Sequence, residues 1–282
     1  MGRFPWRLLL ACLCGCLAII VSPPKLPLAV SATEPPSASP ATPRVVPPQE
    51  LDSGFQPELG TYAYDVLLAG VQVGEAYVTI AKDDEYYQIT VQAQTNRAIN
   101  LVYNLRYLGQ ARVIKDPFTP VTAEIKERSG RRKKDVAIDF QNGSGVKTTS
   151  VVKKGRRKAE VAQQEYSPEA FGLDPFSAVC LIRRLEWEPG LAVEFHVFTG
   201  NRDYVMRFTC QEAVDLMVAG RKRQAWVIIP RRLDKAEGKR MRVFVSRDGN
   251  KEILKIVGHA RVGDVTARLH DFQPAGRSGK GK

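Results

Sequence analysis

Histidine is scarce in this sequence, and the patterns that carry common enzyme chemistry are missing from it. The three histidines, His196, His259 and His270, have no second histidine at the His-x-His or His-x-x-x-His spacing of many metal sites. No Gly-x-Ser-x-Gly elbow, phosphate-binding glycine loop or Gly-x-Gly-x-x-Gly fingerprint occurs. The nearest imitation of these motifs, Gly143-Ser144-Gly145, lies where a hairpin is expected to turn, so we interpret it as a turn. The sequence therefore predicts no metal, no cofactor and no recognisable catalytic residue.

Cysteine is also sparse once the first part of the chain is set aside. Three of the five cysteines, Cys12, Cys14 and Cys16, lie near the N-terminus, which leaves Cys180 and Cys210 for the rest. Two cysteines in an oxidising compartment can form one disulfide, or they can stay as buried free thiols. Both alternatives remain open, because the sequence gives no distance between them.

No apolar run in the chain is long enough to cross a bilayer comfortably. The longest, Leu8–Val21, has about 14 residues and spans roughly 21 Å as a helix, against about 30 Å of hydrocarbon. Arg3 and Arg7 precede it, as in the positively charged start of a secretory signal peptide. We therefore expect a signal peptide rather than a membrane anchor.

The small residues Val30-Ser31-Ala32 suggest that residues 1–32 are removed before Thr33. An alternative interpretation uses Leu13-Cys14-Gly15-Cys16, which resembles a lipoprotein processing box with Cys16 as the lipidated residue. Either alternative predicts a periplasmic or exported protein of the cell envelope.

Acidic residues are fewer than basic ones. The mature chain would keep 39 of the 42 lysines and arginines and all 30 acidic residues, a balance of about +9. Such a balance favours anionic partners such as lipid head groups, lipopolysaccharide or acidic polymers. Nucleic acid is also an anionic partner, but an exported protein is not expected to meet it.

The composition divides the chain into a working part and two flanks. Residues 33–58 are rich in Pro, Ala, Ser and Thr, which predicts a disordered linker. Residues 275–282 are rich in Gly and Lys, which predicts a disordered basic tail. The segment between them, residues 59–274, has no second low-complexity break. We expect it to form one domain.

Alternation of apolar and polar residues dominates that domain. In Tyr87–Ala93 every second residue is apolar, which is typical of a half-buried antiparallel strand. Similar runs are Tyr62–Leu68, Ala76–Ile80, Val121–Ile125, Val205–Thr209, Arg242–Val245 and Ile253–Val257. Turn signals separate them at Ala69-Gly70, Asp83-Asp84, Asn142-Gly143 and Asp248-Gly249. The pattern predicts a mostly β fold, a curved antiparallel meander that forms a half-open barrel.

One segment departs from this alternation. Asp174-Pro175 offers an N-cap followed by proline at the first helical position, and apolar residues then recur at helical spacing. The sequence predicts a short helix from Asp174 to about Leu185, stopped by Pro189-Gly190, that packs on the concave side of the sheet.

Two basic runs flank a predicted hairpin whose turn is Asn142-Gly143. Pairing its strands would bring both runs to the same end. The predicted cluster contains Arg131, Arg132, Lys133, Lys134, Lys153, Lys154, Arg156, Arg157 and Lys158. Like charges that face each other across strands destabilise a sheet, so we expect this cluster to serve binding to an anionic surface. The alternative is a solvated hairpin end that only keeps the protein soluble.

Several local motifs resemble a family of exported bacterial proteins known as domain of unknown function 3108. They are Tyr64-Asp65-Val66, the stretch Gly70–Ala76 and Asp174–Ala178, and the resemblance covers about Tyr62 to Phe272. Near the C-terminus the family tends to show Trp and paired acids ahead of Arg and Pro, whereas this chain has Phe244–Gly249. The resemblance implies an envelope β protein and supplies no catalytic residue.

Three functions follow from these features. The first is a non-enzymatic envelope protein that binds a lipidic or amphiphilic ligand in the curved sheet and contacts a membrane surface peripherally. The second is a structural or assembly factor with a fully packed sheet that binds an acidic envelope polymer or a protein partner. The third is an enzyme that acts on envelope polymers, with catalytic residues too dispersed to leave a linear motif.

Overall fold

The computed structural model describes residues 43–101, 104–141, 145–167, 172–200, 202–234, 241–260 and 263–276. The predicted signal peptide, the Cys16 processing box, residues 33–42 of the linker, the Asn142-Gly143 turn and residues 277–282 of the tail lie outside the described residues. None of the described helices is long and apolar enough to cross a membrane.

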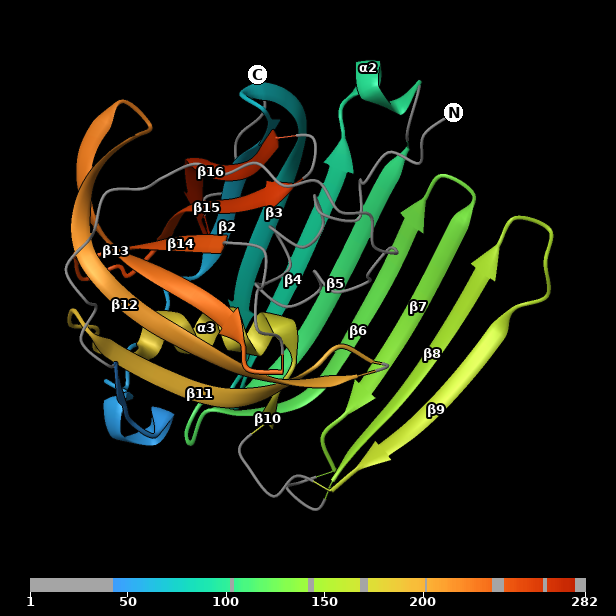
Figure 1. Cartoon of the computed structure of the whole chain (residues 1–282), viewed down its shortest axis with the longest axis horizontal. Helices are drawn as coiled ribbons and strands as arrows, with labels where there is room; N and C mark the ends of the chain where they lie inside the picture. Colours follow the sequence, from blue (N-terminus) through green and yellow to red (C-terminus); the bar gives the residue numbers. More distant parts are fainter. Residues whose placement is uncertain are drawn as a thin grey trace, which may run out of the picture.

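Within the residues that the structure describes, sixteen strands form a single sheet, which is mostly antiparallel and curved as the sequence predicts (Figure 1). The strands are β1 (Arg44–Val45), β2 (Gly60–Leu68), β3 (Val71–Lys82), β4 (Tyr86–Thr95), β5 (Leu105–Ile114), β6 (Thr119–Ser129), β7 (Arg132–Asp139), β8 (Val146–Lys154), β9 (Glu160–Tyr166), β10 (Gly172–Leu173), β11 (Leu191–Phe198), β12 (Asp203–Val218), β13 (Arg221–Arg232), β14 (Met241–Ser246), β15 (Ile253–Ala260) and β16 (Gly263–Pro274). The helical segments are η1 (Pro48–Leu51), α2 (Arg97–Asn100) and α3 (Pro175–Arg184).

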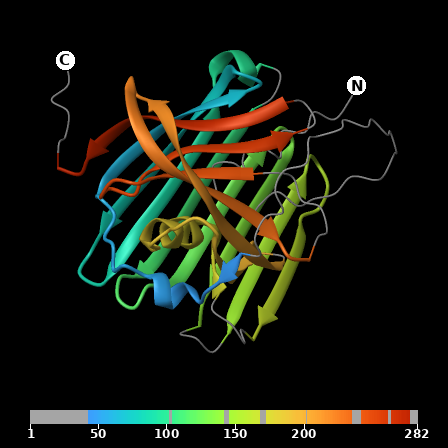
Figure 2. The ribbon, with the colours of Figure 1, turned by 60° about the vertical axis from the view of Figure 1, so that its left-hand side comes forward.

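The strands form two meanders that join in the middle of the sheet. Strands β2 to β9 follow one another as antiparallel neighbours, and so do β11 to β16. The last strand of the chain, β16, pairs antiparallel with β2 and joins the two meanders into one sheet. Figure 1 shows the β2–β9 wall, and Figure 2 shows the β11–β16 strands curling around α3 toward it.

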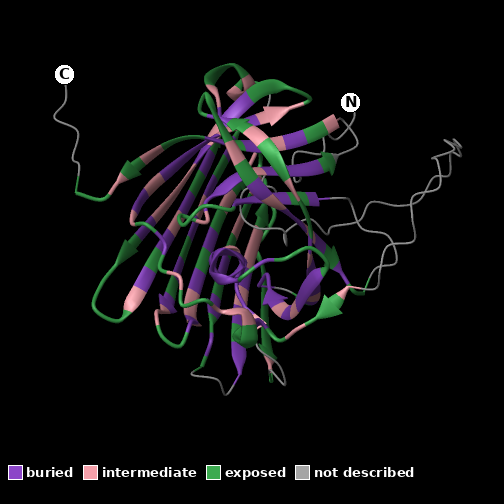
Figure 3. Cartoon of the chain, turned by 90° about the vertical axis from the view of Figure 1, so that its left-hand side faces the viewer, coloured by how far each residue is buried: buried purple, intermediate pink, exposed green. Residues whose placement is uncertain are grey.

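Side-chain alternation explains why these segments are strands. In β4 the odd-numbered residues Tyr87–Ala93 are buried, whereas Gln88 and Gln92 are exposed. The same two-residue period appears as alternating buried and exposed bands along the wall (Figure 3). Strands with this period, such as β4, therefore present one apolar face to the interior and one polar face to solvent.

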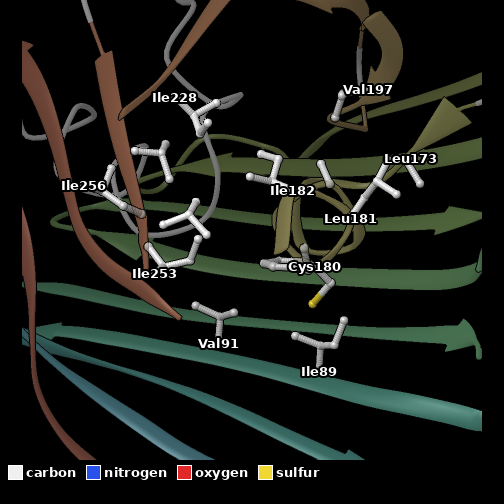
Figure 4. Close-up of a cluster of buried hydrophobic side chains, with 14 of the residues drawn as sticks. Ile89, Val91, Leu173, Cys180, Leu181, Ile182, Val197, Ile228, Ile253 and Ile256 are labelled. Carbon is white, nitrogen blue, oxygen red and sulfur yellow. The ribbon is translucent and has the colours of Figure 1, made fainter. Parts of the chain in front are cut away.

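Helix α3 fills the concave side of the sheet and confirms the predicted helix. The carboxylate of Asp174 caps its N-terminus by accepting hydrogen bonds from the backbone N–H groups of Phe176 (2.8 Å) and Ser177 (3.1 Å). Figure 4 shows Cys180 and Ile182 among side chains of the surrounding sheet, including Val91 of β4. A packed helix thus fills the concave side of the predicted half-open barrel.

A glycine sets how closely the helix approaches the sheet. A Cβ atom on Gly109 of β5 would lie 2.1 Å from Cζ of Phe176 in α3. Such a distance is far below van der Waals contact, so the ring of Phe176 occupies the space that a side chain at position 109 would need.

The linker differs from the expectation. Residues 43–58 were expected to be disordered, yet Arg44 and Val45 pair in parallel with β11. Asp52 accepts hydrogen bonds from Arg184 Nε at 2.9 Å and from Arg184 Nη2 at 2.8 Å. These contacts with distant residues offset the ordering entropy of the segment, which its Pro-rich composition alone cannot do.

Candidate functional site

The predicted basic hairpin is formed by β7 and β8. Arg132 lies opposite Lys154, Lys133 opposite Lys153, and Lys134 opposite Val152. The two basic runs therefore meet at one end of the hairpin, as the sequence predicts. We call the nine residues Arg131–Lys134, Lys153, Lys154 and Arg156–Lys158 the cationic hairpin end.

Turn contacts hold this end together. The backbone N–H of Gly155 donates to the carbonyl of Arg131 at 2.8 Å, which joins the turn after β8 to the turn before β7. The N–H of Gly130 donates to the carbonyl of Asn104 at 2.9 Å, beside the start of β5. Gly130 and Gly155 have φ of +55° and +61°, which favours glycine at both turns.

The pleat of the sheet divides the cations between its two faces. Val136 and Ile138 of β7 are buried in the core, so Arg132 and Lys134, four and two residues before Val136, lie on the same concave face. Lys154 shares that face because it lies opposite Arg132. The concave face thus places basic groups beside an apolar interior.

The remaining cations point elsewhere. Lys133 and Lys153 are exposed on the convex face and lie directly opposite each other. Arg131 and Arg156–Lys158 belong to the connecting turns. Sequence reasoning grouped all nine and missed this division, although counting back in twos from Val136 would have found it.

Carboxylates from neighbouring strands accompany the concave cations. Glu127 of β6 lies opposite Lys134, and its carboxylate is 3.8 Å from Nη1 of Arg132. Glu160 of β9 is 3.6 Å from Nζ of Lys154. The side chain of Glu127 is only 14% exposed, so it is the better shielded of these partners. The cationic hairpin end nevertheless has a large excess of positive charge.

A second polar cluster lies at the C-terminal end of α3. The guanidinium of Arg183 donates to the hydroxyl of Tyr62 at 3.1 Å and to the carbonyls of Asn250 (3.1 Å) and Lys251 (2.8 Å). Arg184 forms the fork with Asp52 already described. The acceptors all belong to the chain itself, so this cluster fastens the helix to the linker and to the β14–β15 turn.

The other titratable groups of the interior are also held by the fold. Burial raises the pKa of Asp174, whose carboxylate caps α3, and the pKa of Tyr64, whose hydroxyl donates to the carbonyl of Ile253 at 3.1 Å. Cys180 and Cys210 are buried free thiols, which decides between the two alternatives for these residues. Within the described ranges, no three His, Cys, Asp or Glu side chains gather as a metal site requires.

The fold and this site define a class of protein: a curved, barrel-like antiparallel sheet with a helix inside and a basic hairpin end. The family model "Protein of unknown function (DUF3108)" matches residues 62–270, so the chain belongs to that family. The family is the one that the local motifs resemble, and its match supports no particular chemistry.

A solved structure shares the architecture. The chain is similar to the beta-barrel-like protein of domain of unknown function DUF1849 from Brucella abortus, with a TM-score of 0.50 and 10% sequence identity. The similarity covers 78% of this chain and 99% of that chain, and at this identity it shows the fold alone. No curated protein matches the sequence.

Proposed function

We propose that this protein is a non-enzymatic component of the cell envelope that binds anionic amphiphiles and docks on anionic surfaces through its cationic hairpin end. The observation that carries the proposal is the β7–β8 register, which sets Arg132 opposite Lys154 and Lys133 opposite Lys153. Like charges opposite each other destabilise a sheet by up to about 1 kcal/mol per pair. Glu127 and Glu160 offset part of this cost at Arg132 and Lys154, and the remaining cost is best explained by an anionic ligand.

The two faces of the hairpin suit two parts of such a ligand surface. Arg132, Lys134 and Lys154 on the concave face match an anionic head group, and they lie at the margin of the apolar interior to which Val136 and Ile138 belong. Lys133 and Lys153 on the convex face, with the basic turns, match neighbouring head groups. Each Lys or Arg close to an anionic bilayer contributes roughly 1 kcal/mol.

Export to the envelope stays part of the proposal and rests on the N-terminal pattern of Arg3, Arg7 and the apolar run Leu8–Val21. An anionic bilayer is the surface that such a protein meets.

Mass spectrometry of the protein purified natively from the envelope tests the ligand. We expect a co-purified anionic lipid that disappears when Arg132 and Lys134 are both changed to Gln, and that is retained when exposed Lys126 of β6 is changed to Gln. A protein that carries no lipid in either form contradicts the amphiphile part of the proposal.

A second candidate function is a structural or assembly factor that holds an acidic polymer or a protein partner. The packing of α3 favours it, because Phe176 and Leu181 fill the concave side that a ligand would otherwise use. This candidate predicts that the purified protein carries no lipid. It also predicts salt-sensitive binding to an acidic polysaccharide, and neutral vesicles should not compete with that binding.

A further inference from the structure

The two edges of the sheet differ in whether further strands pair with them. At the β11 edge, β1 and β10 each add a short parallel strand, with Arg44 opposite Leu191 and Gly172 opposite His196. At the other edge, β9 pairs with β8 alone within the part of the chain that the structure describes. Figure 1 shows β9 at the right-hand margin of the wall.

Strand β9 lacks most of the features that usually protect an edge. Edge strands are commonly kept from pairing by charged side chains, especially Lys, and by Pro, bulges or shortness, and β9 has only Glu160 and Glu165 near its two ends. The sequence of β9, Glu160–Tyr166, contains no Lys, Arg or Pro, runs for seven residues, and pairs with β8 without a register shift. Its first six residues are all exposed. A row of backbone N–H and C=O groups is therefore accessible to another strand.

We propose that β9 is a self-association edge, where two copies of this chain pair antiparallel about a two-fold axis near Gln163. Two identical strands can pair antiparallel only in a self-complementary way, which is the geometry of a two-fold dimer. With Gln163 at the axis, Ala162 lies opposite Gln164 and Val161 lies opposite Glu165. No like charges face each other in this register.

The charges of β9 support this arrangement. Glu165 is 3.3 Å from Nζ of Lys147, and Glu160 is 3.6 Å from Nζ of Lys154, so both carboxylates are compensated within their own chain. The middle of the strand, from Val161 to Gln164, is neutral. A neutral centre lets two copies approach without burying unpaired charge.

The charge of the whole molecule favours the antiparallel direction. A parallel pair would set the two cationic hairpin ends side by side, whereas an antiparallel pair separates them. It also brings Arg156–Lys158 of one copy toward the end of β9 in the other, where Glu165 lies. Burial and then the nearby carboxylate of Asp203 raise the pKa of Tyr166, so Asp203 adds negative charge at that same end. Because Lys147 already offsets Glu165, Asp203 supplies the negative charge that faces Arg156–Lys158 of the other copy at both ends of the pair.

Sedimentation equilibrium of the full exported chain over a range of concentrations tests the proposal. We expect a monomer–dimer equilibrium in the parent. Gln163→Lys should weaken dimerisation at least tenfold, because two lysines then meet at the axis, and Gln163→Glu should weaken it likewise. An equimolar mixture of the two variants should restore the dimer, because opposite charges then meet. The matched control is Gln92→Lys, an exposed glutamine on the interior strand β4, and it should dimerise like the parent.

Hydrogen exchange provides an independent readout. Backbone amides within Glu160–Tyr166 should become more protected as concentration rises in the parent, and not in Gln163→Lys. A parent that stays monomeric at every concentration overturns the proposal. A dimer that neither charge variant weakens also overturns it, because the copies then meet elsewhere. Neither result depends on whether the cationic hairpin end binds lipid.

Discussion

At the scale of single residues, Asp174 shows how a local signal can be read from sequence. Its carboxylate accepts two backbone hydrogen bonds and one from the Ser177 hydroxyl, and its side chain is fully buried. The cap, the following proline and the helical spacing all lie within a dozen residues. The helix was therefore predictable without knowledge of the rest of the fold.

Replacing Asp174 with Ala should lower the free energy of unfolding by about 0.5 to 2 kcal/mol, because the N–H groups of Phe176 and Ser177 lose their acceptor. Denaturant melts of parent and variant measure this loss, and Asp174→Asn is the matched control that keeps an acceptor. An unchanged midpoint for Asp174→Ala would mean that the cap does not stabilise the helix.

The two buried thiols give a prediction that depends on pH. Burial raises the pKa of Cys180 and of Cys210 to about 12, whereas an unfolded thiol has a pKa of about 8.5. Their contribution to stability is complete below about pH 8.5 and is lost as pH rises toward 12, because only the unfolded thiols ionise in that window.

Alkylation at pH 8 followed by peptide mapping checks this prediction. A thiol with a pKa of 12 has a thiolate fraction of about 10⁻⁴ at that pH, so neither cysteine should react until denaturant is added. Rapid labelling of the native protein at Cys180 would show that the helix does not shield it.

At the scale of elements, the pairing of β7 with β8 was predictable from the sequence. The face of the sheet on which each cation lies was not predicted. The turn signal and the alternation were enough to bring the basic runs together. The division of the cations into concave and convex sets depends on which face the core covers, and that depends on the other strands and on α3. The ordered linker was missed for the same reason, since Asp52 is ordered by Arg184, 132 residues later.

The contact between α3 and β5 can be tested at Gly109. Changing Gly109 to Val should lower the free energy of unfolding by about 1 to 3 kcal/mol, because the new side chain must displace the ring of Phe176. Combining it with Phe176→Ala should cost less than the sum of the two single changes, since the smaller side chain makes room. Denaturant melts of the four proteins provide the double-mutant cycle, and strictly additive losses would contradict this packing.

At the scale of the whole molecule, the joining of the two meanders into one sheet had no local signal. Each meander was predictable from alternation and turns, but the pairing of β16 with β2 joins segments about 200 residues apart. The use of β1 and β10 to cover the β11 edge likewise depends on the finished sheet. Long-range pairing of this kind is decided by the packed interior rather than by neighbouring residues.

Export and the position of the mature N-terminus are predictions that stand on the sequence alone. We expect the mature chain to begin near Thr33, because the apolar run is too short to span a bilayer and small residues precede that position. N-terminal sequencing of the exported form measures this directly. A start at Cys16 with attached acyl chains would instead identify a lipoprotein.

The central claim is that the cationic hairpin end docks on anionic surfaces, and vesicle co-sedimentation at two salt concentrations tests it most directly. Parent protein should sediment with phosphatidylglycerol vesicles and stay in solution with phosphatidylcholine vesicles. Neutralising either Arg131–Lys134 or Lys153–Lys158 should weaken sedimentation, and neutralising both should weaken it further.

Binding should also fall steeply from low salt to 0.15 M, where the Debye length is about 8 Å, because exposed charges are then screened. Gln variants of Lys126 and Lys222, exposed lysines outside the cationic hairpin end, are the matched controls and should bind like the parent. If the hairpin variants sediment like the parent at both salt concentrations, the claim is contradicted, and the nine cations serve only to keep the protein in solution.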